Sequence, residues 1–241
     1  MKIIDATWEL PNLGVVTKEV NLDADDAVES LEQIRNLDCE YSVVRVPAAR
    51  VDLMFKLDDL GYRFIETIIH VQHDLKNIGS TLSPVTKRIA ESITYAEMNE
   101  EDLAELCDQL KAGMFDTDRI SLDPMFSQDI AAKRYIKWIK DEVARGGKVF
   151  KCVLKGKTFG YFLSRINDEN INCVYHIGTY KEFVHAGLGV CLVHTTVRQA
   201  FEAGAKRTIG GFSSNNVPST KANLSAGYQI TAMQYVYIKH H

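Results

Sequence analysis

The chain has 241 residues, of which 46% are apolar and 25% are charged, and its formal net charge is −4. This length allows one large domain or two small ones, and the composition is typical of a soluble globular protein. The nearly balanced charge offers no overall field for attracting nucleic acid or an anionic membrane, so we expect neither as a partner.

The cysteines and the N-terminus favour a cytoplasmic protein. The five cysteines are odd in number, lack C-x-x-C spacing and stand within apolar runs, where a thiol behaves as a small hydrophobe: Cys39, Cys107, Cys152, Cys173 and Cys191. They predict neither disulfides nor a metal site. The first ten residues lack the long apolar segment of a signal peptide, and no stretch is long enough to span a membrane.

The first part of the chain alternates predicted strands and helices. β-Branched and alternating apolar residues predict strands at residues 1–10, 15–20, 40–47 and 63–75. Residues 23–37 predict a helix with Asp23 as its N-cap, and residues 50–62 predict a helix that ends at Gly61. A polar stretch rich in Gly, Ser, Thr and Pro follows. We interpret residues 77–91 as a linker between domains of residues 1–76 and 92–241.

The second part predicts the order β-α-α-β-β-β-α-β-α-β. Helices are expected at residues 99–113, 127–147, 188–203 and 215–226, three of them with an N-cap at Asn99, Ser127 or Asn216. Strands are expected at residues 93–98, 148–154, 158–166, 170–180, 206–212 and 229–238. Residues 114–126 predict an irregular connection.

Two segments repeat one local pattern. "LDDLGYRFIETIIHVQ" and "NLSAGYQITAMQYVYI" both run from a helix through Gly-Tyr into a strand. Helix-Gly-strand is a common joint, so chance is one explanation. The other is that the first part is a reduced relative of the second.

Two motifs in the second part resemble the GNAT superfamily of acetyl-CoA-dependent N-acetyltransferases. The turn "VHAGLG" matches the family's Gln/Arg-x-x-Gly-x-Gly/Ala loop at Gly187 and Gly189, although Val184 replaces the Gln/Arg. The later helix matches at Asn216, Ser219 and the Gly227-Tyr228 pair. The order of elements over residues 93–240 agrees as well, and the narrower likeness is to bacterial sugar-nucleotide N-acetyltransferases of the dTDP-fucosamine type. The resemblance implies a mixed, splayed α/β (α+β) sheet flanked by helices, with a smaller GNAT-like N-terminal domain.

The resemblance also implies a site for acetyl-CoA. Main-chain N–H groups at the N-terminus of a helix attract a pyrophosphate, and glycine lets it approach closely. The expected loop is Val184, His185, Ala186, Gly187, Leu188 and Gly189, with Asn216 and Ser219 nearby. In the preceding strand, Ile177 and Thr179 are expected to pair with the pantetheine arm, and the N–H of Thr179 to polarise the thioester. Gly210 and Gly211 are consistent with an opening beside that strand.

The residues at the proton-transfer positions differ from those usual in the GNAT family. Tyr175 lies where the family often places a base, while His176 alternates to the other face and is expected to be packed or exposed. Asn223 occupies the usual position of a tyrosine acid and can only hydrogen-bond the sulfur. Tyr228 is an alternative acid, although a tyrosine after a terminal glycine more often packs in the core.

The acceptor site is expected at "MFDTDRIS". Asp116 and Asp118 offer carboxylates for an amine or for sugar hydroxyls, and Arg119 offers a phosphate partner, although aspartates are also common in solvated turns. Three functions stay open: acetylation of a nucleotide-linked amino sugar, acetylation of another amine (an amino acid, antibiotic or protein N-terminus), and acyl-CoA binding without fast catalysis. The expected partner is a small-molecule amine, and a homodimer is one alternative for the assembly.

Overall fold

The computed structural model describes residues 1–241 as one sheet with helices on both faces. The strands are β1 (Lys2–Asp5), β2 (Thr17–Asn21), β3 (Tyr41–Pro47), β4 (Arg63–His73), β5 (Thr94–Glu97), β6 (Lys148–Leu154), β7 (Lys157–Ile166), β8 (Ile171–Thr179), β9 (Arg207–Ser213) and β10 (Gln229–His240). The helices are α1 (Leu10–Leu13), α2 (Val51–Asp59), α3 (Pro84–Glu91), α4 (Glu100–Lys111), α5 (Arg119–Leu122), α6 (Gln128–Ala144), α7 (Gly189–Glu202) and α8 (Val217–Ser225). Two 3-10 helices are η1 (Val28–Ile34) and η2 (Lys181–Phe183). None of the helices has the length and apolar character needed to cross a membrane.

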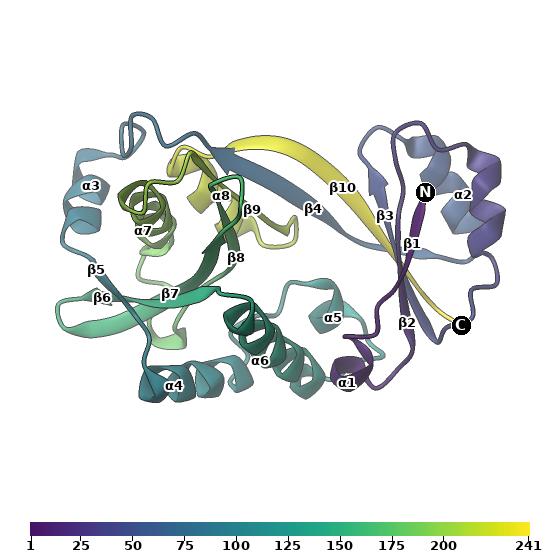
Figure 1. The fold of residues 1–241 in the computed structure, drawn as a ribbon, viewed down its shortest axis with the longest axis horizontal. Helices are drawn as coiled ribbons and strands as arrows, with labels where there is room; N and C mark the ends of the chain where they lie inside the picture. Colours follow the sequence, from purple (N-terminus) through teal and green to yellow (C-terminus); the bar gives the residue numbers. More distant parts are fainter.

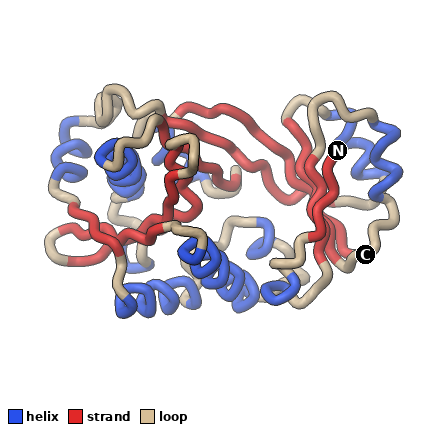
Figure 2. Tube along the Cα trace, viewed as in Figure 1, coloured by secondary structure: helices blue, strands red, loops and turns tan.

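The sheet runs in the order β1-β2-β3-β10-β4-β9-β8-β7-β6-β5. Neighbours pair antiparallel except for β2–β3 and β8–β9, which are parallel. The mixed α/β fold with a large open sheet is therefore as predicted. Figure 2 shows the strands continuing from the first half of the molecule, which contains β1, β2 and β3, to the second half, which contains β5 to β9, with helices outside them.

Strands β4 and β10 exchange places between the two halves. β4 follows β3 and α2 in the chain, yet it pairs with β9 and β10. β10 follows β9 and α8, yet it pairs with β3 and β4. The two strands therefore form the long antiparallel pair that arches between the halves in Figure 1.

The repeated sequence pattern coincides with this exchange. Gly61 after α2 and Gly227 after α8 both have left-handed backbones, with φ of 80° and 95°. Tyr62 and Tyr228 follow them, and both are buried. Each repeat then enters one of the exchanged strands, so the two segments occupy corresponding places.

Two layers of helices enclose the second half of the sheet. On β6 and β7, Phe150, Phe159 and Phe162 pack with the α7 residues Cys191 and Leu192. The alternate residues of these strands, including Val149 and Tyr161, pack with α4 and α6 through Leu106 and Ile139. Each strand therefore contributes to a core on both faces, and a β-bulge at Phe159 places this residue on the same face as Phe162.

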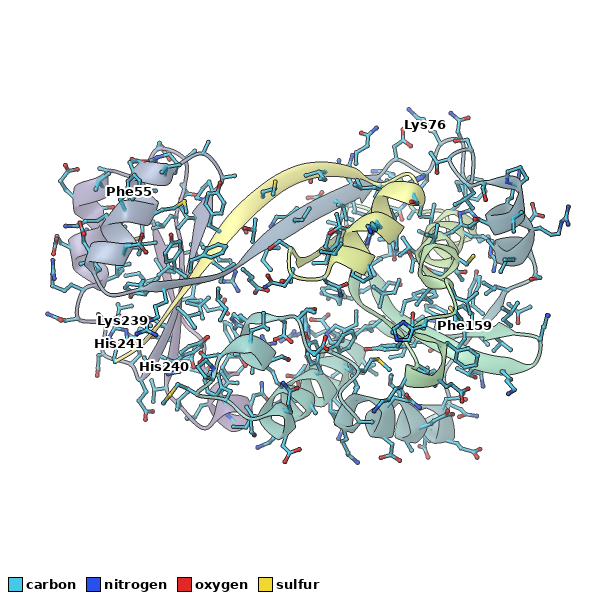
Figure 3. All side chains as sticks on the ribbon, turned by 180° about the vertical axis from the view of Figure 1, so that it is seen from behind. Phe55, Lys76, Phe159, Lys239, His240 and His241 are labelled. Atoms are coloured by element: carbon cyan, nitrogen blue, oxygen red, sulfur yellow. The ribbon has the colours of Figure 1, made fainter.

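Another core joins the two halves. Tyr41 and Val43 of β3 and Val236 of β10 pack against Ile120 of α5 and Ala131 of α6. At the end of β10, the ring of His240 contacts the carboxylate of Asp123 at 2.8 Å. Figure 3 shows His240 beside Lys239 and His241 at the first half, far from Phe159 in the second.

The structure corrects several predicted elements. The first strand ends at Asp5, and the rest of the expected strand leads into α1, with Pro11 in its first turn. The helix expected at 23–37 is only the 3-10 helix η1, and Asp23 does not cap it. Instead, the Asp26 carboxylate accepts the N–H of Asp23 and binds the N-terminal amine, which holds this segment in a turn.

Two connections contain unpredicted helices. Within the segment expected as a linker, Ser83 caps α3 by accepting the N–H of Thr86, and Pro84 occupies its first turn. Within the irregular connection, Asp118 caps α5 by accepting the N–H of Ile120. The remaining order of the second part is confirmed, including the Asn99 capping box of α4 and the Ser127 cap of α6.

Candidate active site

Strands β8 and β9 separate after a short parallel ladder. They pair only from Ile171 with Arg207 to Cys173 with Ile209. A cavity of about 250 Å³ begins beyond this point, between Val174 to Ile177 of β8 and Gly210 to Ser213 of β9. Gly210 leaves room here, because a Cβ at this position would only reach van der Waals distance from Val174. The expected opening beside β8 is thus present.

The backbone of β8 presents unpaired N–H groups to this opening. Tyr180 donates its N–H to the carbonyl of Phe159 at 2.9 Å, and the regular register between β7 and β8 extends back to His176. Because N–H groups alternate sides along a strand, those of Ile177 and Thr179 point away from β7. No acceptor is found for either of them. This is the edge that the resemblance assigns to the pantetheine arm.

The turn before α7 supplies a second group of free donors. Gly187 has a φ of 71°, and a Cβ there would meet nothing within 4 Å. No acceptor is found for the N–H groups of Gly187, Leu188, Gly189 and Val190 at the beginning of α7. Val184, His185 and Ala186 are exposed, while the Leu188 side chain is buried in the core. Together with the helix dipole, these donors suit an anion.

Helix α8 borders the cavity with residues that already have partners. The Asn216 side chain caps the helix by accepting the N–H of Ser219 at 2.9 Å. The Asn223 amide donates both to the carbonyl of Ser219, at 2.9 Å, and to its hydroxyl, at 3.3 Å. An amide nitrogen has two protons, so Asn223 keeps only its oxygen free and has no donor left for a sulfur.

Tyr228 belongs to the core and also touches the cavity. Its hydroxyl lies 3.2 Å from that of Thr196 and 3.4 Å from that of Thr208. Burial raises the pKa of Tyr228, with the two threonines opposing the change. Of the two roles expected for Tyr228, an acid or a core residue, its surroundings agree with core packing.

A β-bulge interrupts the pairing between β7 and β8. Leu163 of β7 pairs with His176 and Ser164 with Val174, so Tyr175 is the extra residue. The Tyr175 hydroxyl accepts from Arg165 at 2.8 Å. His176 is packed, as one of the two expected alternatives, with its ring centroid 4.2 Å from that of Trp138. Burial, together with Arg134, lowers the pKa of His176 to about 3, so its ring is neutral at physiological pH.

The three expected acceptor residues lie in different surroundings. Asp116 is exposed and does not line the cavity. Asp118 lines it, but its carboxylate caps α5 and accepts from the Ser121 hydroxyl at 2.7 Å. Arg119 is 5% exposed, and its Nη2 contacts Glu9 at 3.3 Å and Glu19 at 3.5 Å, while its Nε has no partner. The contacts of Arg119 with these glutamates therefore join the two halves of the molecule.

Glu66 of β4 is a cavity residue that the sequence analysis did not identify. Its side chain is 3% exposed, and its Oε2 has no hydrogen-bond partner. Burial raises the pKa of Glu66, with Ser213 and Arg119 opposing the change. The one available signal was a carboxylate within the largely apolar "FIETII" run. Nothing local indicated that this strand crosses into the other half of the sheet.

Comparisons with known proteins agree on the fold. No family model and no curated protein sequence matches the chain. Among solved structures, it is similar to a GCN5-related N-acetyltransferase from Sphaerobacter thermophilus, with a TM-score of 0.57 and 12% identity over 83% of this chain. The chain spans 59% of the length of that protein.

Two further structures have comparable similarity. A GCN5-related N-acetyltransferase from Kribbella flavida has a TM-score of 0.57 and 14% identity, covering 94% of this chain and 82% of that one. A glucosamine N-acetyltransferase region of a fungal multi-domain β-N-acetylglucosaminidase has a TM-score of 0.61 and 11% identity, covering 88% of this chain and 27% of that one. The chain thus has the fold of the GNAT N-acetyltransferases.

Proposed function

We propose that this protein is an N-acetyltransferase that moves the acetyl group of acetyl-CoA to a primary amine by direct attack. The observation that carries the proposal is the pair of free backbone edges around the β8–β9 opening. Ile177 and Thr179 offer unpaired N–H groups along β8, and Gly187 to Val190 offer them at the beginning of α7. An extended amide-bearing arm and a pyrophosphate are the two chemical groups that such donors fit.

The residues of the chain have distinct parts in this reaction. The N–H groups at the turn bind the pyrophosphate, and Ile177 aligns the pantetheine arm beside β8. The N–H of Thr179 stabilises the negative charge that develops on the carbonyl oxygen during attack. Acetyl-CoA supplies the thioester whose acetyl group the amine takes.

Protonation of the leaving thiolate falls to water in this proposal. Asn223 has no free donor, and burial raises the pKa of the Tyr228 hydroxyl, which lies between two threonines. The Tyr175 hydroxyl, fixed by Arg165, borders the cavity and orders that water.

An amino sugar, free or on a nucleotide carrier, is the acceptor we favour. The narrower sequence resemblance supports this choice, and the aromatic wall of Phe115, Tyr135 and Trp138 offers surfaces that suit a sugar ring. Another amine is the second candidate. Acyl-CoA binding without fast catalysis is the third, and the absence of a free donor on Asn223 is the observation that favours it.

The test is release of free thiol from acetyl-CoA with a panel of amines. The panel contains glucosamine, a nucleotide-linked amino sugar, an amino-acid amide and a peptide with a free N-terminus. Release with formation of the acetylated amine is the expected result. No release with any amine, while acetyl-CoA still raises the melting temperature, would leave a binding protein and contradict the proposed reaction.

A further inference from the structure

We propose that Glu66 binds the ammonium group of the acceptor and receives its proton. This inference rests on the proposed function and assigns the amine end of the site to a residue from the first half of the chain. The observation behind it is a single carboxylate, buried and without an ion pair, that lines the same cavity as the open edge of β8.

The strand exchange is what brings Glu66 to the cavity. Glu66 lies opposite Val236 in the β4–β10 pair, and both residues line the cavity. Two residues further along β4, Ile68 pairs with Ser213 at the end of β9. The β8–β9 opening is therefore bounded on one side by a strand of the first half, and Glu66 is the carboxylate that this strand contributes.

The other charged groups at this end already have partners. Arg134 contacts Glu9 at 2.7 Å, and Arg45 contacts Glu19 at 2.9 Å. Arg119 contacts both of these glutamates. Glu66 forms no ion pair within 4.0 Å, although it shares the cavity with all three arginines. Its Oε2 is thus the free acceptor among these carboxylates.

An unpaired buried carboxylate is costly for the folded protein. A buried polar group without a hydrogen bond destabilises the folded state, and a catalytic or binding role is one reason for which natural proteins keep such a group. A primary ammonium is the complementary group, because it supplies both the opposite charge and the missing donor.

The proton balance follows from this contact. An ammonium must lose one proton before its nitrogen can attack a carbonyl carbon. One N–H bond breaks, an O–H bond forms on Glu66, and the nitrogen lone pair becomes available. Burial raises the pKa of Glu66, so its carboxylate is a better proton acceptor than a glutamate in water.

The test compares Glu66→Gln, Glu66→Asp and the exposed control Glu29→Gln. Calorimetry with glucosamine, a nucleotide-linked amino sugar, an amino-acid amide and a peptide, in the presence of unreactive coenzyme A, measures acceptor binding without turnover. We expect Glu66→Gln to weaken binding of the amine by about 10- to 100-fold and to leave acetyl-CoA binding unchanged. Glu66→Asp restores part of the affinity, and Glu29→Gln behaves as the unmodified protein.

Two controls separate this inference from the proposed reaction. A hydroxyl analogue of the bound amine should show no preference between the unmodified protein and Glu66→Gln. Amine binding that depends on Glu66 without thiol release would support the inference and contradict the reaction. Thiol release that is equal in the unmodified protein and Glu66→Gln would overturn the inference and leave the reaction standing. Failure of every amine to bind would also overturn the inference.

Discussion

Cys173 of β8 and Ile209 of β9 form the last pair of the parallel ladder between these strands. Beyond them, β9 continues alongside β4, while β8 continues alongside β7 alone. A strand that loses one neighbour keeps a row of unsatisfied N–H and C=O groups. The candidate active site is this row, together with the glycine turn before α7 and the cavity beside it.

The glycine turn can be tested with a matched pair of variants. Gly187 and Gly204 have φ values of 71° and 76°, and a Cβ at either would meet no atom within 4 Å. Gly187→Val and Gly204→Val should therefore lose similar stability, on the order of 1–3 kcal/mol, from the left-handed backbone. Only Gly187→Val should weaken acetyl-CoA binding, measured by calorimetry. Equal weakening by both variants would argue against the anion site.

Neutralising the buried glutamates Glu9 and Glu66 should change the free energy of unfolding in opposite directions. Removing the charge of Glu9 leaves Arg134 without its ion-pair partner and Arg119 with Glu19 alone, so Glu9→Gln should lower the free energy of unfolding by about 3 kcal/mol at pH 7. Glu66 has no such partner, so Glu66→Gln should raise the free energy of unfolding by about 1 kcal/mol or less. Urea unfolding measures both values.

The pH dependence of these variants follows from the pKa directions. Burial alone would raise the pKa of Glu9, but Arg134 and Arg119 hold it below its ordinary value. Its stabilising contribution is present above about pH 4 and disappears as the pH falls through the folded-state pKa. For Glu66, with its raised pKa, the contribution is present in acid and is lost as the pH rises. A stability gain of Glu66→Gln that is largest below pH 4 would contradict this assignment.

His176 should remain uncharged throughout the range in which the protein works. Burial, with Arg134, lowers the pKa of His176 to about 3, and its ring packs among Phe115, Tyr135 and Trp138. The imidazole resonances of His176 should therefore not titrate between pH 5 and 8 in an NMR experiment. A midpoint near neutrality for His176 would make it a candidate base after all.

Tryptophan fluorescence should report acceptor binding through one of two side chains. Trp138 lines the cavity, whereas Trp8 is 45% exposed and does not line it. Binding of an amine should change the emission of Trp8→Phe as it does that of the unmodified protein, and the change should vanish in Trp138→Phe. If the signal disappears with Trp8→Phe instead, the acceptor binds outside this cavity.

Local signals made much of the fold predictable. Asn99, Ser127 and Asn216 cap the helices that they were expected to cap, because a capping side chain acts on the next three residues. Gly61 and Gly227 end helices through their own left-handed backbone. Ser83 and Pro84 carried the same type of signal for α3, but the polar composition around them favoured a linker.

The features that the sequence did not predict depend on pairing between segments that lie far apart in the chain. The sequence of β4 predicts a strand but does not state that Ile68 will pair with Ser213, because that contact joins segments far apart in the chain. The position of Glu66 in the cavity follows from this pairing. The same is true of Arg119, whose partners Glu9 and Glu19 lie about one hundred residues earlier. In the segment "MFDTDRIS", which was expected to bind the acceptor, Arg119 therefore mainly joins the two halves of the molecule.

Amide hydrogen exchange along β8 tests the central claim most directly. The N–H groups of Gly178 and Tyr180 face β7, while those of Ile177 and Thr179 face the opening. Saturating acetyl-CoA should slow exchange at Ile177 and Thr179 and change Gly178 and Tyr180 little, since the latter pair is already bonded. If acetyl-CoA binds, as shown by calorimetry, and exchange at Ile177 and Thr179 is unchanged, β8 does not hold the pantetheine arm and the account is contradicted.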